Sequence, residues 1–365
     1  MSTVVFAPDS FKGSATAAEV ASALAAGWSS VRPDDRIVLA PMADGGEGTL
    51  DAFEVAVPGS SRRPVRVTGP DGAPRNASWL LLPDETAVVE LAETSGIGLM
   101  PALASFDAQT TGFGQAIAAA LDAGATGLLL AIGGSASTDG GAGMLSVLGA
   151  RLLDAAGEAV PPGNRGLTGL DHVELGSLRA LPAGGARVLS DVTSPLLGPD
   201  GAAAVFGPQK GAGPDDVPVL EAGLARFADM LRETGVTVDP ATPGAGAAGG
   251  TGFGLLAWGA TIAPGSAAVG EALGLPALLA GADSVVTGEG RYDDQSAAGK
   301  VPGYVAGLAG AAGIPALLAA GSITAQPRGF AGAVSLSELA GDSAAAIGDP
   351  LRWAAAAGAE LARRA

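Results

Sequence analysis

The chain contains no cysteine among its 365 residues and only one histidine, His172. The lack of cysteine excludes disulfides, thiolate catalysis and metal sites with cysteine ligands. His172 stands in the segment GLDHVELGS, apart from the glycine-rich loops described below, and we expect an exposed loop residue there. A Ser–His–Asp triad is therefore disfavoured, and any general base is expected to be a carboxylate.

Aromatic residues make up only 4% of the chain, although 48% of its residues are hydrophobic. Alanine and glycine therefore supply much of the apolar material, which favours close packing of helices on sheets. Two uncharged stretches, 241–270 and 301–327, exceed the length of a membrane span but are interrupted by glycine and proline. We expect both to be buried pieces of a cytoplasmic protein without a signal peptide or membrane contact.

Positive charge is scarce, since 20 Lys and Arg residues stand against 37 Asp and Glu residues and the net charge is −17. Such a chain is not expected to bind nucleic acid, and an anionic ligand must be met by local cations. Only three basic residues are lysines, Lys12, Lys210 and Lys300, and each lies in a glycine-bearing loop. A compact ammonium suits a phosphate oxygen or a small carboxylate. Surface lysines left by a bias towards arginine are the alternative.

Strand and helix signals alternate at both ends of the chain. The capping box Thr16–Glu19 predicts the start of a helix that ends near Ser29. Further helices are expected from about Thr49, over Tyr304–Ala312 and over Ala344–Arg363. Short apolar runs predict strands at Thr3–Ala7, Ile37–Ala40, Ser284–Thr287 and Ala316–Ala319.

The middle of the chain has a mixed pattern. Three runs separated by turn residues predict antiparallel strands, at Val65–Val67, Ala77–Leu82 and Thr86–Leu91. A helix over Gly114–Ala123 and strands at Leu128–Ile132 and Ala186–Leu189 follow. We therefore predict an α/β protein with a discontinuous open-sheet, Rossmann-like domain and a second, mixed α/β domain inserted into it. The expected bounds are 1–62 plus 283–365 for the first, with part of 108–190 as a further candidate, and 63–282 for the second.

Four loops that mix glycine with polar and charged residues each follow an expected strand: Pro8–Ser14, Asp44–Gly48, Gly133–Gly141 and Gly288–Ser296. Loops at the carboxyl ends of strands are common ligand sites in open α/β sheets. An ordinary glycine turn is the alternative for any one of them, and the four together favour a functional site.

The loop Gly133–Gly141, GGSASTDGG, has the composition of a phosphate-binding loop. Its glycines allow backbone N–H groups to converge on an anion, and its hydroxyls add donors. The sequence has no GxxxxGK[ST] motif, and no GxGxxG opens a helix after the first strand, so a standard dinucleotide site is disfavoured.

In Gly288–Ser296, Arg291 stands between Glu289 and Asp293. A structural ion pair that orders the loop is one interpretation. The other is that Arg291 binds a carboxylate or phosphate while an acid handles Mg²⁺ or a proton.

Taken together, these segments resemble the class I glycerate kinase family. The resemblance rests on VVFAPDSFKGS, PMADGGEGTLDAF, ETSGIGLM, AIGGSASTDGGAGML, DVTSPLLGPDGAAAVFGPQKGA, PGAGAAGGTGFGLLAWGA, TGEGRYDDQSAAGK and LLAAGSI. It covers nearly the whole chain and includes all three lysines. The family fold implied is two α/β domains around a cleft. The reaction implied is transfer of the γ-phosphoryl group of Mg-ATP to D-glycerate, with 2-phosphoglycerate as the product of the bacterial branch.

The resemblance also implies roles for individual residues. We expect Asp191 to be the general base, with Asp44 as second choice, and Lys12 and Arg291 to hold the glycerate carboxylate and the transferred phosphoryl group. The remaining expected site residues are Ser10 and Glu47 for the substrate, Gly133, Gly134, Ser135, Asp139, Lys210, Gly288 and Lys300 for the nucleotide, and Asp293 and Glu289 for Mg²⁺.

Three places depart from the family pattern. Thr138 and Ser194 stand where asparagine is common, and Phe113 and Gln115 where threonine and glutamate are common. The expected function remains an ATP- and Mg²⁺-dependent D-glycerate 2-kinase, as a monomer or a homodimer. The alternatives are phosphorylation at the 3-position, a related hydroxy or sugar acid as acceptor, and a non-catalytic sensor of a small acid.

Overall fold

The protein is described by a computed structural model for residues 1–293, 296 and 300–365, and it divides into two compact α/β units. Unit 1 consists of residues 1–44, 51–57 and 264–365, and unit 2 of residues 45–50 and 58–263. The domain bounds expected from the sequence stay a prediction.

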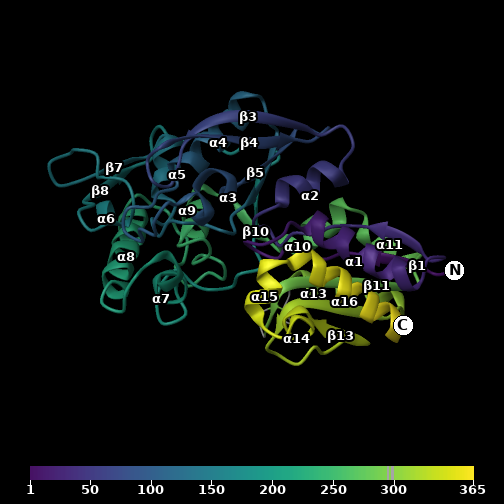
Figure 1. Ribbon diagram of the computed structural model, residues 1–365. Helices are drawn as coiled ribbons and strands as arrows, with labels where there is room; N and C mark the ends of the chain where they lie inside the picture. Colours follow the sequence, from purple (N-terminus) through teal and green to yellow (C-terminus); the bar gives the residue numbers. More distant parts are fainter. Residues whose placement is uncertain (294–295, 297–299) are drawn as a thin grey trace. The chain divides into compact units, whose positions relative to one another are not determined.

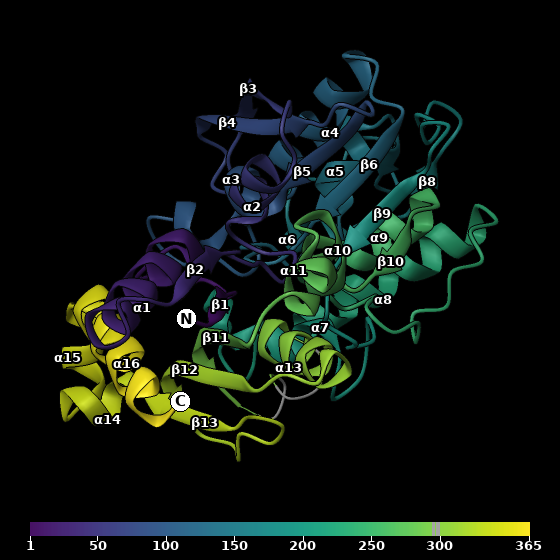
Figure 2. The same cartoon turned by 90° about the vertical axis from the view of Figure 1, so that its right-hand side faces the viewer.

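Unit 1 contains a five-stranded sheet in which every neighbouring pair is parallel, in the order β13-β12-β11-β1-β2. Its elements, drawn in Figures 1 and 2, are β1 (Thr3–Phe6), α1 (Ala17–Val31), β2 (Arg36–Leu39), α2 (Thr49–Ala56, across the boundary at residue 50), α10 (Gly265–Ala272), α11 (Leu275–Ala280), β11 (Ser284–Tyr292), α13 (Val301–Ala312), β12 (Ala316–Ile323), β13 (Gly332–Ser335), α14 (Leu336–Ala340), α15 (Ser343–Gly348) and α16 (Pro350–Arg364). The strand order reverses between β1 and β11, and such a switch point is where open α/β sheets bind ligands.

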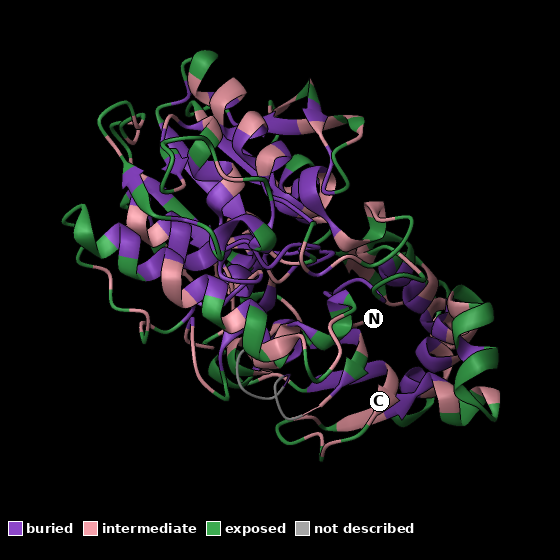
Figure 3. Cartoon of the chain, turned by 90° about the vertical axis from the view of Figure 1, so that its left-hand side faces the viewer, coloured by how far each residue is buried: buried purple, intermediate pink, exposed green. Residues whose placement is uncertain are grey.

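Helices cover both faces of this sheet. Along β12, Leu317 and Ala319 pack with α1 and α16, whereas Leu318 and Ala320 belong to a second cluster on the other face. Burial on both faces explains why β1, β12 and the first part of β11 are nearly continuous apolar runs. Figure 3 shows much of these strands as buried and the outer sides of the helices as exposed, whereas the edge strand β2 has no buried residue.

Helices α1 and α16 lie side by side (Figure 1) and approach closely at two glycines. A Cβ atom on Gly27 would stand 1.8 Å from the carbonyl oxygen of Ala355, and one on Gly358 would stand 2.0 Å from that of Leu24. The contact therefore requires a residue without a side chain on each helix. The predicted capping box at the start of α1 is confirmed, because Thr16 and Glu19 each bond the other's backbone N–H.

Two sequence predictions for unit 1 were wrong. Strand β11 does not end at Thr287 but continues to Tyr292, paired with β12 as far as Ile323, so Gly288–Tyr292 is strand rather than loop. The glycine that indicated a loop instead permits close strand packing, since a Cβ on Gly288 would stand 1.9 Å from the carbonyl oxygen of Ala319. The single helix expected over Ala344–Arg363 is two helices, α15 and α16, with Pro350 at the start of the second.

Unit 2 contains a six-stranded mixed sheet in the order β10-β9-β6-β5-β4-β3 and a two-stranded sheet, β7-β8. Strands β3, β4 and β5 pair antiparallel, as predicted, and the remaining neighbours pair parallel. Its elements are β3 (Ser61–Thr68), β4 (Pro74–Leu81), β5 (Thr86–Glu90), α3 (Leu91–Ser95), the 3₁₀ helix Ile97–Leu99, α4 (Thr111–Asp122), β6 (Gly127–Ala131), α5 (Ala142–Val147), β7 (Arg151–Leu153), α6 (Asn164–Leu167), β8 (His172–Glu174), β9 (Ala186–Leu189), α7 (Ala202–Phe206), the 3₁₀ helix Pro208–Lys210, α8 (Val217–Glu233), α9 (Thr251–Trp258) and β10 (Thr261–Ala263).

His172 is exposed, as expected, but it begins strand β8 rather than lying in a loop. Its strand pairs antiparallel with β7, where His172 stands opposite Leu153. Within the described part of the chain, no helix has both the length and the apolar character needed to cross a membrane.

Candidate active site

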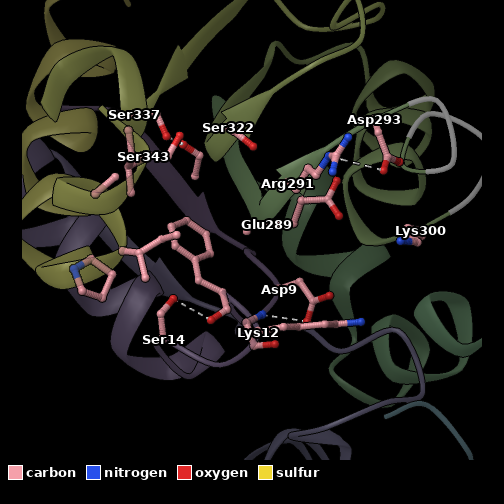
Figure 4. Close-up of a pocket in the computed structure, with 18 residues that line it drawn as sticks. Asp9, Lys12, Ser14, Glu289, Arg291, Asp293, Lys300, Ser322, Ser337 and Ser343 are labelled. Carbon is pink, nitrogen blue, oxygen red and sulfur yellow. Dashed lines mark hydrogen bonds and ion pairs between the residues drawn. The ribbon is translucent and has the colours of Figure 1, made fainter. Parts of the chain in front are cut away.

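A pocket of about 470 Å³ lies in unit 1 beyond the carboxyl end of β1, beside the carboxyl-terminal parts of β11 and β12. It therefore stands at the switch point of the sheet, the position that the strand order favours for a ligand. In Figure 4, the charged side chains labelled Asp9, Lys12, Glu289, Arg291, Asp293 and Lys300 line one part of the pocket, and Ser322, Ser337 and Ser343 line another.

Lys12 presents its ammonium from the loop that follows β1. Its Nζ atom forms an ion pair with Oδ2 of Asp44 at 2.9 Å, with 55% of the Lys12 side chain and 13% of the Asp44 side chain exposed. Burial lowers the pKa of Lys12, but the carboxylates of Asp44 and Asp9 outweigh burial and raise that pKa above its ordinary value. Lys12 is therefore a fixed, fully charged cation at the pocket.

Asp9, three residues before Lys12, is a pocket residue that the sequence reasoning missed. Its carboxyl is 3% exposed, and its Oδ1 accepts a hydrogen bond from the backbone N–H of Ser10 at 2.7 Å. Burial, with repulsion from Asp44, raises the pKa of Asp9 to about 8. A carboxyl directly after a buried strand was the available signal. A pKa close to the working pH is the property that a general base needs.

Glu289 faces the same pocket from β11. The two segments lie side by side, since the backbone N–H of Asp9 donates to the carbonyl oxygen of Gly288 at 2.8 Å. Burial raises the pKa of Glu289 to about 7. Two neighbouring carboxyls with raised pKa values in one pocket are typical of an active site.

The remaining predicted residues of the β11 segment also line the pocket. Arg291 is 68% exposed along its side chain, and its Nε atom stands 4.0 Å from Oδ2 of Asp293. This long, exposed ion pair leaves the guanidinium accessible to an anion. Lys300 lines the pocket as well, whereas Asp294, Gln295 and Gly299 of the same motif lie outside the described residues.

The glycine loop Gly133–Gly141 lies in unit 2, between β6 and α5, so the structure does not place it in the pocket of unit 1. Asp139 is fully buried, and its carboxylate accepts hydrogen bonds from the backbone N–H groups of Thr110, Gly141 and Gly143 and from the hydroxyl of Thr110. This side chain orders the loop from inside. A role for Asp139 in nucleotide binding stays a prediction.

Lys210 is buried beneath the same loop, with 2% of its surface exposed. Its ammonium donates to the carbonyl oxygen of Ser137 and to Oγ of Ser135, at 3.5 Å in the second case. Burial lowers the pKa of Lys210 to about 7, although Asp139 acts in the opposite direction. Lys210 thus holds the glycine loop, and its predicted contact with a nucleotide is not tested.

The acidic motif divides between the units after Asp44. In unit 2, Gly45 has a φ of +86° and lies so close to Leu189 that a Cβ would stand 2.4 Å from its carbonyl oxygen. A Cβ on Gly133 would likewise stand 2.5 Å from the Cα of Gly46. The loop 45–48 therefore lies beside Gly133 and beside the strand end that leads to Asp191. Glu47 is exposed there and Asp191 half-buried.

Glu90 is a second carboxylate that the sequence reasoning missed. It is buried at the end of β5, and its two oxygens accept hydrogen bonds from the backbone N–H groups of Gly48 and Leu50 at 3.2 and 3.0 Å. A negative charge at the first turn of α2 suits the helix dipole. Glu90 therefore fixes the acidic loop.

The departures from the family pattern have structural explanations at two positions. The hydroxyl of the fully buried Thr138 donates to the carbonyl oxygen of Ser105. Gln115 accepts from the backbone N–H of Thr68 at 2.6 Å and so fastens the end of β3 to α4. Both side chains are thus used within unit 2, and nothing in the structure explains Ser194.

Comparison with known proteins identifies the family. Residues 4–365 match the model of the glycerate kinase family. The chain is 43% identical to the glycerate 2-kinase of Escherichia coli (strain K12) over 326 residues, covering 88% of this chain and 85% of that protein. It is 44% identical to the glycerate kinase of Bacillus subtilis (strain 168), with the same coverage.

A comparison with solved structures supports the same family. The chain matches a Salmonella typhimurium LT2 protein described as a glycerate kinase 2 with a TM-score of 0.80 and 39% identity, covering 99% of this chain and 97% of the other. The protein is therefore a kinase. It belongs to the glycerate kinase family, as the motifs indicated.

Proposed function

We propose that the protein transfers the γ-phosphoryl group of ATP to the 2-hydroxyl of D-glycerate, forming 2-phosphoglycerate. Family membership supports a glycerate acceptor, and the relative from Escherichia coli is named a glycerate 2-kinase. The observation that carries the proposal is the pocket of unit 1. It combines three cations, Lys12, Arg291 and Lys300, with two carboxyls of raised pKa.

In this proposal the cations of the pocket neutralise the negative charges of the reactants. Lys12, held by Asp44, and the exposed Arg291 neutralise the acceptor carboxylate and the transferred phosphoryl group. Phosphoryl transfer depends mainly on such positioning and charge neutralisation. The hydroxyls of Ser10 and the pocket serines add hydrogen-bonding groups for a polar substrate.

The base that accepts the hydroxyl proton is a carboxylate. The sequence nominates Asp191 first and Asp44 second. Asp44 is engaged in an ion pair with Lys12, whereas Asp9 has a raised pKa and lines the pocket. Asp9 is therefore a further candidate for the general base, in addition to Asp191. Substitution of each residue in turn distinguishes between the two candidates.

A magnesium ion fits the pocket as a partner of the nucleotide. Mg²⁺ is usually held by one or two carboxylates together with phosphate oxygens and water. Asp293 can supply one such carboxylate, with Glu289 as the other candidate from the sequence. Among the described residues there is no group of three or more acidic or histidine side chains that would form a protein-only cage. The ion would supply charge neutralisation on the phosphates.

The test is turnover of D-glycerate with Mg-ATP, coupled to enolase with and without phosphoglycerate mutase. Product detected by enolase alone is the expected result and means that 2-phosphoglycerate forms. A signal that appears only with mutase moves the phosphate to the 3-position. No signal in either assay, with ATP binding intact, contradicts a glycerate acceptor and favours another hydroxy acid or a sensor.

A further inference from the structure

Two buried oxygen atoms of the pocket in unit 1 have no hydrogen-bond partner. In the described part of the chain, four buried side-chain polar atoms are unpartnered, and Oγ of Ser10 and Oε1 of Glu289 are two of them. Ser10 is 7% exposed and Glu289 is 6% exposed, and both line this pocket. Buried polar groups are nearly always hydrogen-bonded, and a missing partner costs about 1–3 kcal/mol. The pair therefore indicates a ligand group that completes the bonds.

The two side chains lie on adjacent segments. The backbone N–H of Asp9, the residue before Ser10, donates to the carbonyl oxygen of Gly288, the residue before Glu289. The next residue, Gly290, packs against the loop after β1, since a Cβ on it would stand 3.4 Å from the Cα of Phe11. Loop and strand are thus held together, and the two unpartnered oxygens belong to one wall of the pocket.

The surroundings of this wall decide which kind of ligand group fits. An ionised Glu289 repels a carboxylate or phosphate, so such a group fits better beside Lys12 and Arg291 in the same pocket. A positively charged group on an organic ligand is disfavoured because Lys12, Arg291 and Lys300 line the same pocket. Mg²⁺ keeps several waters and demands octahedral geometry, which suits the more accessible Asp293 better than one enclosed oxygen of Glu289. A neutral hydroxyl satisfies both atoms, because it donates to Glu289 and bonds the hydroxyl of Ser10.

We propose that Ser10 and Glu289 form a subsite for the acceptor hydroxyl that is not phosphorylated, so that the enzyme selects acids with hydroxyls on two neighbouring carbons over monohydroxy acids. This inference rests on the proposed function and names the substrate class of that site. An acid without the second hydroxyl leaves the buried Oε1 of Glu289 without a partner, and sites of this kind reject such analogues strongly.

The test compares D-glycerate with two analogues that each lack one hydroxyl, D-lactate and 3-hydroxypropionate, with ADP release measured by chromatography. For the wild type we expect kcat/KM to be at least ~10²-fold higher for D-glycerate than for either analogue. Glu289→Ala should lower kcat/KM for D-glycerate by ~10–100-fold. For D-lactate, which retains the 2-hydroxyl that is phosphorylated, kcat/KM should stay within about threefold of the wild-type value. The preference for D-glycerate over the monohydroxy acid should therefore be largely lost.

Conservative variants separate recognition from folding. Glu289→Gln keeps an acceptor oxygen and should retain most of the preference for D-glycerate. Ser10→Ala should lower kcat/KM by ~3–10-fold for D-glycerate alone. Glu271→Gln and Ser22→Ala, at exposed positions on α10 and α1 outside the pocket, are the matched controls. A variant that is merely misfolded lowers kcat/KM for all acids equally, and an unchanged preference in Glu289→Ala overturns the inference.

A metal-binding role is distinguished in the same experiment. If Glu289→Ala raises the Mg²⁺ concentration required for half-maximal rate but keeps the preference among the acids, Glu289 is a metal ligand and the inference is wrong. If the wild type does not phosphorylate glycerate, the proposed function fails, and calorimetric binding measurements test the subsite separately. Tighter binding of D-glycerate than of D-lactate, with the difference lost in Glu289→Ala, supports the subsite. Equal binding of the two acids by the wild type overturns it.

Discussion

Replacing Asp9 by asparagine should stabilise the protein while it removes activity. Burial raises the pKa of Asp9 from 3.8 to about 8, so the folded protein holds a proton that the unfolded chain releases above about pH 4. Below pH 3.8 both states are protonated, and the carboxyl has no effect on stability. Between pH 3.8 and about 8 the wild type loses stability as the pH rises, and above that range the loss is constant. Asparagine carries no ionisable proton and avoids this loss.

The size of the effect follows from the shift. One unit of pKa corresponds to about 1.4 kcal/mol, so even half of the shift amounts to about 3 kcal/mol at pH 9. For a domain of roughly 150 residues, such as unit 1, this corresponds to about 6–12 °C in Tm. The difference in Tm between Asp9→Asn and the wild type should therefore grow from near zero at pH 4 to its full value near pH 9. Asp34→Asn, at an exposed position in the same unit, is the matched control.

Kinetics complete the experiment. If Asp9 is the base, kcat/KM of the wild type rises with pH up to about 8, and Asp9→Asn loses ~10²–10⁴-fold together with the rising limb. Scanning calorimetry from pH 4 to 9 and a pH series of initial rates measure the two effects. A Tm difference that does not change with pH refutes the buried, protonated carboxyl. Turnover close to that of the wild type removes Asp9 from the role of base.

Substitutions at three further positions, Asp191, Lys12 and Gly358, test other parts of the site and the fold. Asp191→Asn should reduce kcat by ~10²–10⁴-fold with little change in ATP affinity if Asp191 is the base, and near-normal turnover in initial-rate assays excludes it. Lys12→Met should reduce kcat/KM at least ~10-fold because the cation beside Asp44 is lost; Lys12→Arg should also be impaired, and a fully active arginine variant contradicts the need for a compact ammonium. Gly358→Ala should destabilise unit 1 by about 1–3 kcal/mol, because its Cβ would stand 2.0 Å from the carbonyl oxygen of Leu24. Gly307→Ala, where nothing lies within 4 Å, should not destabilise it in the same thermal melts.

Much of the fold was predictable because it depends on local patterns. Apolar runs gave β1, β2, β12 and the first part of β11, although not β13, and the capping box at Thr16–Glu19 gave the start of α1. The errors lie where tertiary contacts override local preference. The sequence pattern predicts Gly288 in a loop, but this glycine is needed in β11 because the carbonyl oxygen of Ala319 leaves no room for a side chain.

The candidate site was predictable in part for a related reason. Residues with distinctive chemistry, such as Lys12 and Arg291, were named from composition and motif, and both line the pocket. Lys210 has the same chemistry but lies buried beneath a loop, and no sequence pattern distinguishes a cation that binds a ligand from one that orders a loop. Asp9 was missed for the opposite reason, because its importance depends on burial beside Asp44 and Glu289, which only the folded chain brings about.

Burial of these carboxyls also resolves a conflict between charge and function. A net charge of −17 disfavours the approach of an anionic substrate, and the pocket contains three carboxyls, Asp9, Glu289 and Asp293, beside its three cations. Because burial raises the pKa values of Asp9 and Glu289 to about 8 and about 7, protons neutralise much of this negative charge near pH 7. The pocket then presents a net positive charge to an entering anion. The same protons limit the fraction of enzyme in which Asp9 is ionised and can act as a base. A rise in pH therefore weakens anion binding while it increases the fraction of enzyme with an ionised Asp9.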